Sequence, residues 1–132
     1  MDRELREAGE AIRRKVLGDE YVDRAMGQAD AFSAPFQDVV NEYCWGLAWT
    51  DTALAPAQRS LLNLGMLAAL GRMHEFRTHF RGALRNGLSH DELRAALIQI
   101  TVYCGIPAGV EVFRIAREVL SETSEAGGEG VE

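Results

Sequence analysis

The sequence has few cysteines and no long hydrophobic run. Cys44 and Cys104 are its only two cysteines and belong to no metal-binding or redox motif, so we expect reduced thiols in a cytoplasmic protein. The longest uncharged apolar run, near residues 61–70, is much shorter than the roughly 20 residues that a membrane-spanning helix needs. Residues 1–18 alternate in charge and contain no apolar segment of a secretory signal. These absences argue against a membrane partner.

An excess of basic residues is also missing, because the formal net charge of the 132-residue chain is −6. Four glutamates near the C-terminus account for most of this charge, and the remainder of the chain is still slightly acidic. A nucleic-acid partner is therefore not expected. The length and the 47% hydrophobic content predict one globular domain over residues 1–121. Residues 122–132 are acidic and rich in glycine, which predicts a disordered tail.

Helical periodicity recurs along the whole domain, whereas no alternating strand pattern extends beyond a few residues. Proline opens several of the expected helices, glycine closes others, and Ser89 with Glu92 forms a capping box. The sequence therefore predicts an all-α bundle of six or seven helices, near residues 2–16, 20–32, 35–49, 56–70, 72–85, 91–104 and 107–120. Several of these helices are apolar on more than one face, which predicts a homo-oligomer that buries the surplus.

The segment RMHEFRTH, residues 72–79, resembles at first sight the His-Glu-x-x-His motif of zinc peptidases. That motif needs histidines four apart, but His74 and His79 are five apart and diverge by about 140° around a helix, so no metal site is expected. Glu75 and His79 are four apart and share one face. A carboxylate beside an imidazole raises its pKa and suits proton transfer, although an ordinary surface pair is the simpler interpretation.

Four segments together resemble the carboxymuconolactone decarboxylases: NEYCWGLAW, RSLLNLGMLAALGRMHEF, HFRGALRNGLSHDEL and QITVYCGIPAGVEVFRIAREVL. The resemblance covers about residues 10–120. It implies an all-helical fold in homotrimers or homohexamers, and cofactor-free decarboxylation of 4-carboxymuconolactone to 3-oxoadipate enol-lactone in protocatechuate degradation. A sister branch of disulfide reductases carries two thiols where this chain has Arg72 and Glu75, so thiol peroxidase or disulfide reductase chemistry is not expected.

The implied substrate is a small anionic lactone that carries its own electron sink, so the protein must bind a second carboxylate and deliver a proton. Arginine binds a carboxylate with two parallel hydrogen bonds, which favours Arg59 and Arg72, although surface solvation is the alternative for each. We expect His79, oriented by Glu75, to be the general acid.

Glu42 is a second acid–base candidate, because it shares a helical stripe with Trp45 and Trp49. The two tryptophans are expected to wall an apolar substrate pocket, with core or subunit-interface packing as an equal alternative. The chain departs from the family pattern at Asp51, where an arginine is usual, and at Ala95, where a glutamate is frequent. These departures leave open another lactone, a β-keto acid, or a non-catalytic ligand-binding role.

Overall fold

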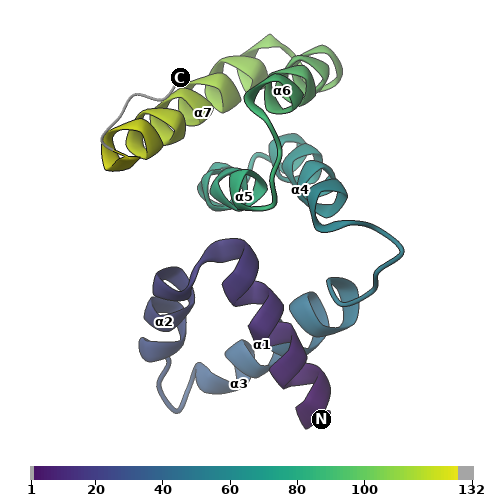
Figure 1. Ribbon diagram of the computed structural model, residues 1–132, viewed down its shortest axis with the longest axis vertical. Coiled ribbons are helices and arrows are strands. Elements are labelled where there is room, and N and C mark those ends of the chain that lie inside the picture. The colour runs from purple at the N-terminus through teal and green to yellow at the C-terminus, as the bar shows by residue number, and fades with distance from the viewer. Residues whose placement is uncertain (1, 128–132) are drawn as a thin grey trace. The chain divides into compact units, whose positions relative to one another are not determined.

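The computed structural model describes the backbone of residues 2–127 and the side chains of residues 2–122. Within this range the secondary structure is helical and contains no strand, which confirms the all-α prediction (Figure 1). No described helix is long and apolar enough to cross a membrane. The helices are α1 (Arg3–Leu17), α2 (Asp19–Gly27), α3 (Ala34–Val39), the π-helix η1 (Val40–Ala48), α4 (Pro56–Leu70), α5 (Met73–Arg85), α6 (His90–Cys104) and α7 (Ile106–Gly127).

Local sequence signals explain most of these helix ends. The predicted capping box is present at the start of α6: the Ser89 hydroxyl accepts a hydrogen bond from the Glu92 backbone N–H, and the Glu92 carboxylate accepts one from the Ser89 backbone N–H. Gly71 separates α4 from α5 with a φ of 74°, a left-handed conformation that favours glycine. The α2 helix ends at Gly27, earlier than the predicted residue 32.

The last helix is longer than predicted, since α7 continues to Gly127 instead of ending near residue 120. Residues 121–126 contain neither glycine nor proline, so nothing in this stretch breaks the helix, and Gly127 is the first residue with low helix propensity. The described helix thus covers residues 122–127 of the predicted tail, and disorder of residues 122–132 stays a prediction. Residues 128–132 lie outside the described part of the chain.

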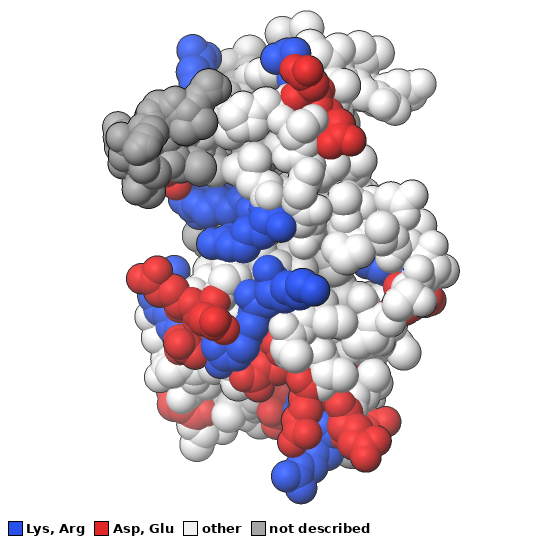
Figure 2. All heavy atoms as spheres, viewed as in Figure 1, with Lys and Arg blue, Asp and Glu red and all other residues white. Residues whose placement is uncertain are grey.

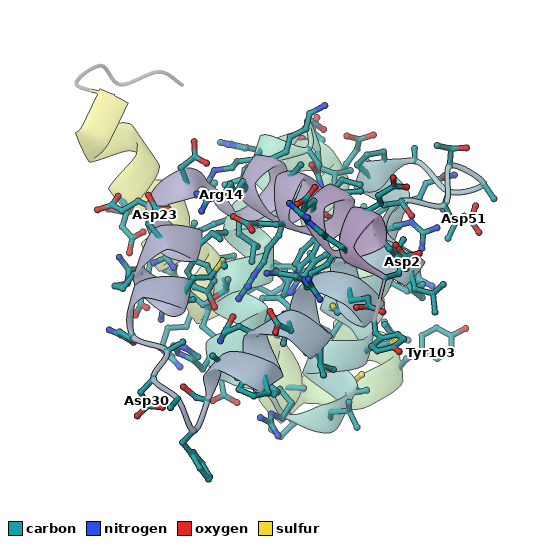
Figure 3. The ribbon with its side chains drawn as sticks, turned by 90° about the horizontal axis from the view of Figure 1, so that it is seen from below. Asp2, Arg14, Asp23, Asp30, Asp51 and Tyr103 are labelled. Atoms are coloured by element: carbon teal, nitrogen blue, oxygen red, sulfur yellow. The ribbon has the colours of Figure 1, made fainter. Side chains whose placement is uncertain are left out.

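The chain divides into two compact units, Met1–Arg59 and Ser60–Glu132. In the first unit, α1 packs against η1 and α2, and α3 continues directly into η1 (Figure 1). The Arg14 side chain links α1 to α2 by ion pairs with Asp19 and Asp23 at 3.2 and 2.8 Å (Figure 3). Apolar side chains of α1, α2 and η1 form the core of this unit: Val16, Leu17, Val22, Trp45 and Trp49.

Two glycines allow α1 and η1 to approach each other closely. A Cβ atom built on Gly9 would lie 1.8 Å from the Asn41 carbonyl oxygen and 2.5 Å from the Gly46 backbone nitrogen. A Cβ atom on Gly46 would lie 2.7 Å from the Leu5 carbonyl oxygen. Because the atoms met at these distances are backbone atoms, no side-chain rotation can make room for a larger residue.

The second unit contains α5, α6, α7 and nearly all of α4. In it α6 and α7 pack side by side, and α5 packs on α7 (Figure 1). Phe76 and Phe80 of α5 are at most 1% exposed, and their rings are stacked with centroids 6.1 Å apart. Acidic and basic side chains are interspersed on the face shown in Figure 2, with uncharged areas between them.

Candidate active site

The α5 helix carries two of the predicted site residues, Glu75 and His79, within its first two turns, and a third, Arg72, directly precedes it. It buries Phe76, Phe80 and Ala83 as its apolar face, and His79 lies half-buried at the border of that face. The helix ends as predicted at Asn86 and Gly87, where the glycine has a φ of 93°. His79 is therefore held on a rigid, well-packed helix, which is a suitable position for a reacting group.

The imidazole of His79 meets the side chain of Asn63, which comes from α4. The Asn63 Nδ2 atom lies 3.4 Å from His79 Nδ1. An amide nitrogen can only donate, so in this arrangement Nδ1 accepts and the neutral ring carries its proton on Nε2. The sequence indicated Glu75 as the residue that orients His79, whereas the side-chain contact found for its Nδ1 atom comes from Asn63.

Burial lowers the pKa of His79 below its usual value of 6.5, and the charge of Glu75 opposes this effect only in part. The prediction that the carboxylate raises the pKa of this histidine above its usual value is therefore wrong in its net sign. The physical reason is that a half-buried imidazole loses water from its charged form, whereas Glu75 is 45% exposed and screened by solvent.

Glu75 pairs with Arg72, the residue that precedes α5. The Arg72 Nε atom lies 3.4 Å from Glu75 Oε1, and both side chains are substantially exposed. Hydrogen bonding from its own backbone N–H and then from Arg72 holds the pKa of Glu75 below its usual range, so it is a carboxylate at neutral pH. The structure thus brings Arg72, Glu75 and His79 together on one short segment, with Arg72 already bound to an anion.

The remaining predicted site residues belong to the first unit. Glu42 lies in η1, is 3% exposed, and accepts a hydrogen bond of 3.1 Å from the Asp2 backbone N–H. Its second carboxylate oxygen has no hydrogen-bond donor among the described residues, although Arg6 forms an ion pair with it at 3.9 Å. A buried carboxylate within a π-helix is unusual, and π-helical turns are frequent at functional sites.

Trp45 and Trp49 pack against each other with ring centroids 4.8 Å apart. They are 3% and 9% exposed and lie in the core cluster with Val16, Leu17 and Val22. This is the packing role that the sequence left open as an alternative to a substrate pocket.

Arg59 stabilises the loop after η1. Its Nη2 atom donates a hydrogen bond of 2.8 Å to the Asp51 carbonyl oxygen, and its Nε atom is buried without an acceptor among the described residues. The Asp51 carboxylate accepts a hydrogen bond from the Ala53 backbone N–H at 2.9 Å, at the edge of the first unit (Figure 3). Asp51 therefore has a local role in a turn. The predicted site residues fall into two groups, one in each unit.

Sequence reasoning missed Asn63 and a second polar contact in the same unit. Ser60 is fully buried, and its hydroxyl accepts a hydrogen bond of 2.9 Å from Asn86 Nδ2. Ser60 and Asn63 are three positions apart and therefore share a face of α4. Polar residues at helical spacing within the apolar segment RSLLNLGMLAAL are the signal that points to both.

Among the described residues, no group of three or more His, Cys, Asp and Glu side chains is placed to hold a metal ion. His74, the other histidine of the RMHEFRTH segment, is exposed.

Known proteins resemble this chain along most of its length. The model of the carboxymuconolactone decarboxylase family matches residues 34–118. The chain is 35% identical to the nitrosuccinic acid decarboxylase of Metarhizium robertsii, over 96% of this chain and 89% of that protein. It is 32% identical to the 4-carboxymuconolactone decarboxylase of Acinetobacter baylyi, over 92% of this chain and 90% of that protein. Both relatives are named decarboxylases, in agreement with the predicted enzyme class, a carboxy-lyase. The chain belongs to the carboxymuconolactone decarboxylase family.

Proposed function

We propose that this protein decarboxylates a small dianionic acid whose leaving carboxylate sits on a carbon that can pass its electron pair to an electron-withdrawing group, directly or through a double bond, with 4-carboxymuconolactone as the first candidate. The observation that carries the proposal is the 32% identity to a 4-carboxymuconolactone decarboxylase over 92% of the chain. The half-buried His79 on α5, in contact with Asn63, supports it as a group able to deliver the proton.

Nitrosuccinic acid is the second candidate, favoured by the 35% identity to a decarboxylase named for that acid. The two candidates share their chemistry. In each, the bond between carbon and carboxylate breaks, carbon dioxide leaves, and the electron pair moves into the lactone carbonyl or the nitro group. In nitrosuccinate a proton then bonds to the carbon that lost the carboxylate. In 4-carboxymuconolactone the electron pair passes through the ring double bond, which shifts onto the carbon that lost the carboxylate, and the proton bonds to the ring carbon next to the lactone carbonyl. Neither acid requires a metal or an organic cofactor as electron sink.

His79 supplies the proton in this proposal. Because burial lowers the pKa of His79, its ring is neutral in most molecules of the free enzyme at pH 7. A bound dianion favours the charged imidazolium and raises this pKa, so the histidine takes up a proton as the substrate binds. Nε2 delivers that proton to the carbanion, and solvent restores it after product release.

Among the predicted site residues near His79, Arg72 is the one that we propose binds the second carboxylate of the substrate, because it adjoins α5 and is exposed. The substrate carboxylate then replaces Glu75 as the partner of Arg72. The planar guanidinium can bind it with two parallel hydrogen bonds. The roles of Glu42 in proton transfer, of Arg59 in carboxylate binding, and of Trp45 and Trp49 as apolar walls remain predictions.

An assay of carbon dioxide release with each of the two acids tests the proposal, using the parent protein, His79→Ala and the matched control His74→Ala. Loss of a general acid lowers kcat by about 10²–10⁴-fold, so we expect this effect in His79→Ala. His74 is exposed on the same helix, so its replacement should change kcat by less than about twofold.

The acid that is turned over faster identifies the substrate. Absence of turnover of both acids by a folded parent protein would contradict the proposal, and so would an equal loss of activity in the two histidine variants. Chelator in the buffer should leave the rates unchanged.

A further inference from the structure

The second unit contains a small, partly open pocket lined by residues of α5, α6 and α7. Its volume is about 290 Å³, near the lower end of the range for pockets that bind small molecules. Its floor consists of side chains at most 5% exposed, Phe80, Leu93, Leu97 and Ala116. The half-buried Phe113 and Leu120 complete the apolar part of the lining. A floor of this kind is suited to an apolar ring or a short chain.

The polar part of the pocket is basic. His90, Arg94 and Arg117 line it together with the apolar residues, and no carboxylate is among the described residues that do so. Arg94 is bound to Asp91, with its Nη2 atom 2.6 Å from Oδ1. The chain as a whole has a net charge of −6, but the polar groups of this pocket are all basic. The pocket therefore favours anions over cations.

Arg117 is the free cation of this pocket, since it makes no hydrogen bond or ion pair within the described residues. It also borders the neighbouring groove, where the nearest acid along the chain is Glu118. Glu118 already forms ion pairs with Arg77 and with Arg114, the latter at 3.3 Å. Arg117 therefore remains available for an anion from solution.

We propose that this pocket binds a small carboxylic acid with an apolar body, such as an aromatic monocarboxylate. The carboxylate binds the guanidinium of Arg117 with two parallel hydrogen bonds. The apolar body contacts Phe80 on the floor and the half-buried Phe113, where it replaces water.

This site is separate from the group around His79. His79 does not line the pocket, and Phe80, which does, is rotated from it by about 100° around α5. The inference goes beyond the proposed decarboxylation, because the proposed general acid His79 is not among the residues that line this pocket. It places a second binding site for acids in the same unit.

Two-dimensional NMR titration of the full chain with benzoate tests the proposal without any measurement of turnover. We expect saturable shifts at Leu97, Phe113 and Ala116, with a dissociation constant in roughly the millimolar range for so small a ligand. Arg117→Gln should weaken benzoate binding about tenfold, as expected for loss of a charged hydrogen-bond partner. The matched control Arg85→Gln removes an exposed arginine outside the pocket and should leave the constant unchanged.

Two further probes separate the contributions of charge and apolar contact. Benzyl alcohol lacks the charge and acetate lacks the ring, so each should bind at least about tenfold more weakly than benzoate. Benzoate binding should persist in His79→Ala. The proposal is overturned if benzoate does not saturate, if Arg117→Gln binds it as tightly as the parent does, or if His79→Ala abolishes binding.

Discussion

At the scale of single residues, His79 shows how burial and charge compete for control of one proton. Glu75 favours the charged imidazole, but its exposure to water weakens that effect, and burial of the ring prevails. The pKa of His79 is therefore lower in the folded chain than in the unfolded one. As pH falls through about 6.5, the unfolded chain takes up the proton first, so this residue decreases the free energy of unfolding in acid and contributes nothing above that pH.

The contact between Asn63 and His79 predicts the effect of a charge at the same place. In Asn63→Asp, a carboxylate would face Nδ1, accept a hydrogen bond from its N–H and favour the imidazolium, so we expect the pKa of His79 to rise above 6.5 and the proton of the neutral ring to move to Nδ1. Long-range ¹H–¹⁵N NMR spectra recorded during a pH titration report both changes. If His79 is the general acid, the value of kcat/KM falls as pH rises through this pKa, and that fall moves to higher pH in the variant.

A matched control for this experiment is Asn86→Asp, the same change at a side chain that donates to Ser60. It should shift the pKa of His79 much less. An unchanged pKa in Asn63→Asp, or a parent ring with its proton on Nδ1, would show that Asn63 does not set the state of the histidine.

At the scale of helices, the close contact between α1 and η1 predicts that Gly9 cannot be replaced by a larger residue without loss of stability. A methyl group there would overlap the Asn41 carbonyl oxygen and the Gly46 backbone nitrogen, so the two helices must move apart. We expect Gly9→Ala to lower the free energy of unfolding by roughly 1–3 kcal/mol, the usual cost of overpacking. The control Gly27→Ala adds a methyl group in open space at the end of α2 and should be neutral or slightly stabilising. Equal denaturation midpoints for the two variants would refute the close approach.

Helix ends were predictable because their causes are local. The capping box at Ser89, the glycine after α4 and the proline that begins α4 all act within a few residues of the end they define. The π-helical course of η1 was not predictable, since an α-helical periodicity was assumed for the stripe of Glu42 and the two tryptophans. The Asn63 contact was also missed, because it depends on how α4 packs against α5, and sequence spacing carries no information about distances between helices.

At the scale of the whole molecule, exposed apolar side chains bear on the predicted homo-oligomer. Three helices carry most of them in the second unit: Leu62, Met66 and Leu70 on α4, Ile98, Val102 and Tyr103 on α6, and Ile106 and Val110 on α7. Each is between 47% and 82% exposed. Single exposed apolar residues are ordinary on protein surfaces, but a set of this size on neighbouring helices is characteristic of an interface.

Homotrimers or homohexamers remain the prediction, and light scattering coupled to size-exclusion chromatography measures them directly. We expect a mass of three or six times the 14.6 kDa of the chain. Val102 is 72% exposed, so Val102→Glu should leave the monomer folded while placing a charge in the interface, where an unpaired buried charge costs several kcal/mol. The variant should therefore dissociate at concentrations where the parent is assembled, whereas Gln28→Glu, the same change of charge at an exposed position of the first unit, should not. A monomeric parent at high concentration would mean that these apolar faces serve another purpose than self-association.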